Sequence, residues 1–173
     1  MSSDIYQEII DLLPKLRRFA YGLTRSKENA EDLVQEACAR LLADLKEKES
    51  YLERWLFRTI RNIHIDQVRK NSVAERHQSH LVDHDTPYVD GNEVVETLLT
   101  LDQAKSVLFE LSEEHRTVLL LVGVEGFSYR EAADILDLPI GTVTSRLARA
   151  RNSVVQMVKG GSVIEGDLEV QRL

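Results

Sequence analysis

The chain has 173 residues, of which 43% are apolar and 29% are charged, and its net charge is −7. This composition is typical of a folded globular protein and excludes a disordered chain. The longest apolar run, Val118–Val122, is too short to cross a bilayer, so we expect no membrane insertion. The acidic N-terminus predicts no signal peptide, and the single cysteine, Cys38, fits a protein of the reducing cytoplasm.

Charge alternates in blocks along the chain. Segments 28–53 and 77–96 each carry a net charge of −5, whereas segment 54–76 carries +4 and segment 137–159 carries +3. The two basic segments predict two separate contact surfaces for a polyanion, and the acidic remainder limits non-specific binding. Ordinary solvated helix faces are the alternative interpretation of such blocks.

Apolar residues in the N-terminal part recur at helical spacing, and no segment alternates as a half-buried strand does. Pro14 should break or kink the first helix, because proline lacks the N–H that the preceding turn needs. A further helix is predicted over about Asn29–Leu45 and another over about Tyr51–Asn71.

Helical periodicity disappears between about Ser72 and Asn92, which predicts a flexible acidic linker. It returns at Val94, and Ser112 is predicted to cap a helix that ends near Gly123 to Gly126. We therefore expect an all-α fold of two small helical domains. The expected parts are a first domain over 1–73, a linker over 74–93, a second domain over 94–159 and a loose tail over 160–173.

The most specific pattern is a helix-turn-helix over Ser128–Arg151. Ser128 and Glu131 form a capping box, and Asp137-Leu138-Pro139 gives a turn of suitable length before the second helix. That helix should bury Val143, Leu147 and Ala150. Its opposite face then carries groups that can read base edges and bind phosphates, namely Thr142, Ser145, Arg146 and Arg149. An ordinary helical hairpin with a basic surface is the alternative.

A second basic face is predicted on the helix that begins near Tyr51. With about 100° of rotation per residue, five polar residues share roughly a third of its circumference. These residues are Arg54, Arg58, Arg61, Asn62 and Arg69. Tyr51 and Trp55 lie at the margin, where an aromatic ring could stack on an unpaired base. A solvated face paired with nearby acids is the alternative.

Three stretches together resemble the extracytoplasmic-function (ECF) group of bacterial RNA polymerase sigma factors. They are Asn29–Glu36, Trp55–Asn62 followed by Asp66–Lys70, and Pro139–Arg151. They occur in the family's order, and with their surroundings they cover about Leu12–Met157. The resemblance implies an alternative sigma factor that binds core RNA polymerase and directs promoter-specific transcription initiation, often in a stress response and under an anti-sigma factor.

The resemblance also implies roles for individual residues. Core polymerase would bind the polar face made by Asp32, Gln35 and Glu36. The minus-ten element would be opened and held as single strand by Arg54, Trp55, Arg58, Arg61, Asn62, Arg69 and Lys70. The minus-thirty-five element would be read by Thr142, Thr144, Ser145, Arg146 and Arg149. Thr144 departs from the lysine common at its position, which removes one expected phosphate contact.

Two other classes of function remain as alternatives. A sigma-like decoy or adaptor would hold an anti-sigma factor by mimicry, and a conventional helix-turn-helix regulator would leave the first half without a role. Binding to core polymerase separates both from an initiation factor.

The sequence shows no catalytic pattern: it has no phosphate-binding loop and no nucleophile elbow. A loose cluster could in principle bind Zn²⁺, formed by His77, His80, His84, Asp83 and Asp85, but a solvated linker is favoured there. We therefore expect no catalytic residue, no metal and no cofactor. Cys38 is interpreted as a small core residue.

Overall fold

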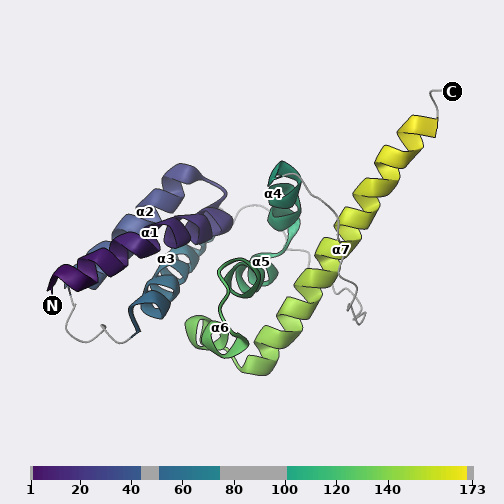
Figure 1. The fold of residues 1–173 in the computed structure, drawn as a ribbon. Coiled ribbons are helices and arrows are strands. Elements are labelled where there is room, and N and C mark those ends of the chain that lie inside the picture. Colours follow the sequence, from purple (N-terminus) through teal and green to yellow (C-terminus); the bar gives the residue numbers. More distant parts are fainter. Residues whose placement is uncertain (1, 44–50, 75–100, 171–173) are drawn as a thin grey trace.

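The computed structural model describes residues 2–43, 51–74 and 101–170 (Figure 1), and every regular element in these ranges is helical. The N-terminal half consists of α1 (Ser2–Thr24), α2 (Lys27–Ala43) and α3 (Leu52–Ala74). The C-terminal half consists of α4 (Leu101–Glu110), α5 (Glu113–Leu119), the π turn η3 (Leu120–Val124), α6 (Tyr129–Leu136) and α7 (Ile140–Val170). The predicted all-α fold is confirmed.

Helices α1, α2 and α3 pack on one another as a three-helix bundle (Figure 1). Each helix buries one apolar stripe, at the spacing that places side chains on a single face. Fully buried members of these stripes include Leu16 and Phe19 from α1, Leu33 and Leu41 from α2, and Phe57 from α3. The polar faces opposite these stripes are left on the outside of the bundle.

Pro14 does not break the first helix, since α1 continues through it from Ser2 to Thr24. Of the two predicted outcomes, a break or a kink, the break is contradicted, and for a physical reason. Pro14 removes the hydrogen bond to the carbonyl of Ile10, but both residues are exposed, so water can reach that carbonyl. Burial of the apolar stripe on the other side, at Ile9 and Leu16, holds the two halves of the helix together.

The C-terminal half places α5 and α6 against the first part of α7 (Figure 1). The predicted cap at Ser112 is confirmed, because its side chain accepts a hydrogen bond from the backbone N–H of His115. Beyond the core, α7 continues through Gly160 to Val170, where the sequence predicted a loose tail. Glycine disfavours a helix by only about 1 kcal/mol and keeps its N–H, so a glycine pair need not end one.

Helix α5 passes into η3, a turn one residue wider than an α-helical turn. Its closing bond runs from Glu125 N to Leu120 O, five positions apart, at 2.9 Å, and just beyond it Phe127 N donates to Leu121 O at 3.0 Å. After this turn, Gly126 adopts a left-handed φ of 80° and Phe127 returns to the core, where it is 7% exposed. The widened turn thus directs Phe127 toward the N-terminal half.

The two halves share one continuous apolar core. We call their contact the seam: α1 and α3 lie on one side, and α5, η3, Phe127 and α6 lie on the other. Across it, the rings of Phe57 and Phe127 meet edge to face with centroids 4.9 Å apart, and the ring of Phe19 contacts Phe57 in a tilted arrangement at 5.0 Å. Such pairs contribute about 0.5–1.5 kcal/mol beyond their buried area.

Candidate nucleic-acid and polymerase interfaces

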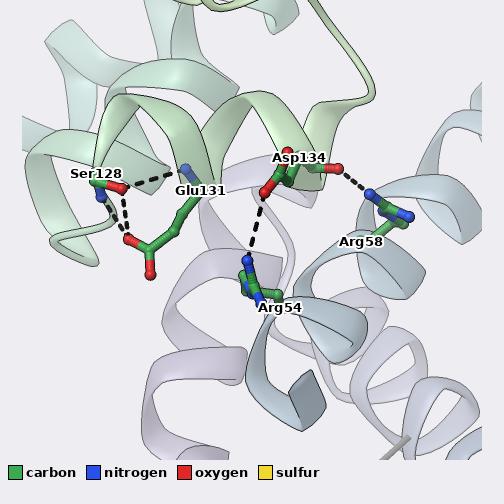
Figure 2. A network of polar contacts seen from close by, with 5 residues as sticks. All are labelled: Arg54, Arg58, Ser128, Glu131 and Asp134. Atoms are coloured by element: carbon green, nitrogen blue, oxygen red, sulfur yellow. Dashed lines mark hydrogen bonds and ion pairs between the residues drawn. The ribbon is translucent and has the colours of Figure 1, made fainter. Parts of the chain in front are cut away.

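The helix-turn-helix is formed by α6, a short turn and the start of α7. Ser128 Oγ accepts from Glu131 N at 3.2 Å, and Glu131 Oε2 accepts from Ser128 N at 2.8 Å, which completes the predicted capping box (Figure 2). The Ser128 hydroxyl also donates to Glu131 Oε2 at 2.8 Å, and the two hydrogen bonds donated by the Ser128 N–H and hydroxyl lower the pKa of the Glu131 carboxyl. Asp137 ends α6 in the left-handed region with φ 54°, and Pro139 O accepts from Val143 N at 3.2 Å to open α7.

The predicted buried face of α7 is confirmed, since Val143, Leu147 and Ala150 are 0–1% exposed. The opposite face leaves Thr144, Ser145 and Arg149 exposed and Thr142 half-buried. The two hydroxyls donate back into the helix, from Thr144 to Ile140 O at 2.9 Å and from Ser145 to Thr142 O at 3.1 Å. This leaves a polar face able to accept hydrogen bonds, flanked by the cation of Arg149.

Arg146 is placed differently from the other predicted recognition residues. Its side chain is 24% exposed, and its guanidinium lies 2.9 Å from the carboxylate of Glu114, at the start of α5. The same side chain lines a cavity of about 330 Å³ at the seam, together with Arg61 and Arg69 of α3. The two predicted DNA-binding helices therefore approach one another at this cavity.

The basic face of α3 is partly covered by α6 (Figure 2). Arg54 lies 3.4 Å from the carboxylate of Asp134, and Arg58 donates to the backbone carbonyl of the same residue. Arg61 is half-buried, and burial is the main cause that lowers its pKa, with the cations of Arg146 and Arg69 acting in the same direction. The predicted face therefore exists, but its first three arginines lie in or beside the seam.

The remainder of the α3 face points to solvent. Asn62, Arg69 and Lys70 are exposed, and Asn62 Oδ1 accepts from Arg61 at 3.2 Å. Near the start of α3 lies a pocket of about 210 Å³. Its lining residues are Tyr51, Arg54, Trp55, Arg58 and Asp134. Two aromatic rings and two guanidiniums around one hollow can stack on a base and bind its phosphate.

Helix α2 presents the predicted docking face without obstruction. Asp32, Gln35 and Glu36 are exposed, whereas Leu33 and Ala37 on the opposite face are fully buried. Glu36 also forms an exposed ion pair with Arg40 at 2.8 Å within the same helix. Such exposed pairs contribute little stability, so the carboxylate stays available to a partner.

Sequence reasoning missed the residues that close the seam. Arg18 binds Glu125 through two hydrogen bonds of 2.8 and 2.6 Å across 107 positions of sequence. Asp134 lies 80 positions from Arg54, and Phe127 meets Phe57. No local pattern relates residues this far apart, so only a tertiary structure could reveal these pairs.

The remaining predicted features involve Cys38 and the linker. Cys38 is half-buried against the core, and desolvation raises the pKa of its thiol, which disfavours the reactive thiolate.

The cluster around His77, His80 and His84 falls outside the described residues. Within the described ranges, no group of three or more His, Cys, Asp or Glu residues is arranged to hold a metal ion. Among the described helices, none is both long and apolar enough to span a membrane.

Comparison with known proteins identifies both halves. Residues 4–73 match the family Sigma-70 region 2, and residues 101–154 match the family Sigma-70, region 4. The chain is 32% identical to the ECF RNA polymerase sigma factor EcfG of Rhodopseudomonas palustris, over 89% of this chain and 84% of that protein.

Solved structures agree with these matches. The sigma factor RpoE of Bartonella quintana, in complex with the anti-sigma factor NepR, is 35% identical with a TM-score of 0.73 over 90% of this chain and 97% of that one. The anti-anti-sigma factor PhyR of the same organism shares the fold at 22% identity and a TM-score of 0.57, over 89% of this chain and 50% of its own. The chain therefore belongs to the ECF family of RNA polymerase sigma factors and is an alternative sigma factor.

Proposed function

We propose that this sigma factor docks on core RNA polymerase through α2, opens the minus-ten element with α3 and reads the minus-thirty-five element with α7. The observation that carries the proposal is the separation of surfaces by charge. An exposed acidic face on α2 and two basic faces on α3 and α7 occur in one chain whose halves match sigma regions two and four.

Docking on polymerase is assigned to Asp32, Gln35 and Glu36. Their exposure opposite a buried stripe suits a helix-on-helix contact, in which carboxylates meet basic groups on the partner helix. Because the α2 stripe is already buried against α1 and α3, the contact would be polar and would leave the fold of the bundle unchanged.

Promoter opening is assigned to α3 and the pocket at its start. A base leaving the duplex would stack on Trp55 or Tyr51, while Arg54 and Arg58 hold its phosphate. Arg61, Asn62, Arg69 and Lys70 continue the face along the strand. Strand separation is then stabilised by capture of the unpaired strand, so α3 needs no ATP.

Reading of the minus-thirty-five element is assigned to the start of α7. Its exposed groups would enter the major groove, where guanidiniums bind guanine edges or phosphates and hydroxyls contact either. The assigned residues are Thr142, Thr144, Ser145, Arg146 and Arg149.

Regulation by an anti-sigma factor in the cytoplasm is part of the same proposal. Its support is the similarity to RpoE of Bartonella quintana, whose structure was solved with NepR. A second candidate function, a sigma-like protein that sequesters an anti-sigma factor, is favoured by the shared fold of PhyR. A protein of that kind needs neither the pocket at Trp55 nor the exposed cation of Arg149.

Transcription in vitro with core polymerase and start-site mapping tests the assignment. Promoter-specific transcripts with shared elements upstream of their starts would support it. Stable binding to a NepR-type protein with no transcripts and no core binding would instead establish the sequestering function.

A further inference from the structure

We propose that a row of three methyl-bearing residues on α7, Ile140, Thr144 and Ala148, contacts thymine methyl groups in the minus-thirty-five element and so determines which sequence this chain prefers. The inference rests on the proposed function of α7 and deepens it, because it names the base that the recognition helix selects. Ile140 and Ala148 lie outside the residues assigned above to DNA.

The row runs along one side of α7 at the edge of the molecule, where its first turns lie beside α6 (Figure 1). Its members are spaced i, i+4 and i+8, so each lies one turn further along the helix and about 40° around it. Thr144 is exposed and Ala148 is half-buried, whereas Val143 and Leu147 point into the core. The row extends about 12 Å along the axis, roughly the height of three to four base pairs.

Ile140 is a large apolar side chain that the core does not use. It is 50% exposed and occupies the first position of α7. One exposed apolar residue is ordinary on a protein surface. In a helix-turn-helix, however, the N-terminal residues of the second helix are those that meet base edges in the major groove. An apolar group at this position is therefore placed to contact an apolar part of a base.

Thr144 contributes a methyl group rather than a hydrogen-bond donor. Its Oγ1 donates to the carbonyl of Ile140 at 2.9 Å, so its only side-chain hydrogen is used inside the helix. The methyl group and the oxygen lone pairs remain for a ligand, because the residue is exposed. A lysine, common at this position in the family, would place a cation in the middle of the row. Threonine keeps the row apolar, which makes the feature particular to this chain.

Gly141 leaves the space next to Ile140 open. A Cβ atom built there would meet no atom of the chain within 4 Å, so packing inside the chain does not require glycine. Glycine also weakens a helix relative to alanine, so helix stability does not favour it either. Without a side chain at this position, the first turn of α7 can approach a base pair closely, which brings the methyl groups of the row within reach of the bases.

The chemistry of the row selects thymine. In the major groove the C5 methyl group distinguishes thymine from the other three bases, and alanine or threonine methyl groups contact it through apolar surface. The polar residues next to the row, Ser145 and Arg149, suit a neighbouring guanine or phosphate. The preferred minus-thirty-five element should therefore contain thymines whose methyl groups face α7.

The test removes single methyl groups from each partner in turn. Holoenzyme is assembled from core polymerase and the full chain. The probe is a fluorescent duplex that carries the mapped minus-thirty-five element and ends upstream of the minus-ten element. Replacing one thymine at a time by deoxyuridine deletes the C5 methyl group and keeps the Watson–Crick hydrogen bonds. On the protein, Thr144→Ser deletes the methyl group but keeps the hydroxyl, and Ile140→Ala truncates the first residue of the row.

Fluorescence anisotropy measures each affinity. With wild type, deoxyuridine at a contacted thymine should weaken binding about fourfold, the effect of one methyl group returned to water. T144S should bind the thymine duplex more weakly by a similar factor. It should also lose its sensitivity to deoxyuridine at the thymine that Thr144 contacts, because that contact is already gone. I140A should lose sensitivity at a different thymine.

Val124→Ala is the matched control, since Val124 is also apolar and 47% exposed but lies in η3. It should keep the wild-type affinity and the wild-type sensitivity to deoxyuridine at every position. All three substituted side chains are exposed, so the melting temperature should stay the same and a loss of binding cannot be ascribed to unfolding.

Two outcomes would overturn the proposal. One is a minus-thirty-five element in which no deoxyuridine weakens binding, which includes an element without thymine. The other is that T144S and I140A both lose as much affinity to deoxyuridine as wild type at every position. Failure of the underlying assignment is recognised separately with Arg149→Ala: if that variant binds the thymine duplex as tightly as wild type, α7 does not read the element.

Discussion

Helices α2 and α3 lie side by side in one bundle, yet they meet their surroundings in opposite ways. The acidic face of α2 points to solvent, while the basic face of α3 meets an acidic residue of the other half at Asp134. A face with no partner inside the chain is ready for an external one. The start of the α3 face already has an internal partner, so a DNA phosphate would have to displace Asp134 from Arg54 and Arg58.

Charge reversal on α2 should produce the largest effect. Asp32→Lys with Glu36→Lys would place like charges against the basic partner surface, which costs several kcal/mol at a close contact. We expect affinity for core polymerase to fall by about a hundredfold or more, measured by fluorescence anisotropy, with an unchanged melting temperature because both side chains are exposed.

The control is Asp11→Lys, an exposed acid on α1 whose partner is Gln7 of the same helix. If the α2 double variant binds core polymerase as well as this control does, the docking face lies elsewhere.

Loss of a recognition arginine should produce the next largest effect. Arg149→Ala should weaken binding to minus-thirty-five DNA by about 1–3 kcal/mol, the usual contribution of such a contact, and leave core affinity intact. Electrophoretic mobility shifts with the mapped promoter measure the first quantity and polymerase titration the second. Parallel loss of both would indicate misfolding, which Arg130→Ala, at an exposed position of α6, controls for.

Asp134→Asn should raise the affinity of the α3 face for single-stranded DNA only slightly. It tests the contrast between the α3 face, which has an internal partner, and the α2 face, which has none. It removes the carboxylate near Arg54 but keeps the carbonyl that binds Arg58. Because an exposed ion pair contributes at most about 1 kcal/mol, affinity for a fluorescent single-stranded oligothymidylate, measured by anisotropy, should rise by no more than about fivefold. An unchanged affinity would mean that the Asp134 carboxylate does not compete with DNA phosphates for Arg54.

The smallest effect should come from pH through His64, a buried residue of α3 whose Nε2 lies 3.6 Å from Glu113. Burial is the main cause that lowers the pKa of His64 below 6.5, Arg116 acts in the same direction, and Glu113 opposes them. Arg61, Arg146 and Glu114 also line the cavity beside it.

A lowered folded-state pKa means that the neutral imidazole is favoured by the fold. The stabilisation is fully present above pH 6.5 and is lost as the pH falls through the lower folded-state value. The free energy of unfolding of wild type should therefore fall on acidification more than that of His64→Gln. Denaturant titrations of both proteins across this range measure the difference, and identical slopes would contradict it.

Much of the fold follows from local patterns. The capping box of Ser128 and Glu131 and the stripe Val143, Leu147, Ala150 concern residues within one or two turns, and these predictions were right. The predicted break at Pro14 did not occur, because the effect of a proline depends on whether the carbonyl that it leaves unpaired can reach water. The sequence alone does not show this.

The site predictions show the same difference between properties of a single helix and contacts that form only when the chain folds. Family resemblance and helical spacing identified the faces of α2, α3 and α7, since each is a property of a single helix. What became of the α3 face depended on Asp134 and Phe127, which meet α3 only after the chain has folded. Arg146 was expected beside its recognition partners, and only tertiary structure shows it paired with Glu114.

The π turn at Leu120–Val124 has a consequence for how this family can vary. A π turn contains one more residue than the α turn it replaces, and one residue of an α-helix corresponds to about 100° of rotation. Deleting a single residue there would rotate Glu125 and Phe127 away from Arg18 and Phe57, although every interacting residue type would still be present. Relatives that differ in length at this turn should therefore differ in how their two halves pack, even where their contact residues are the same.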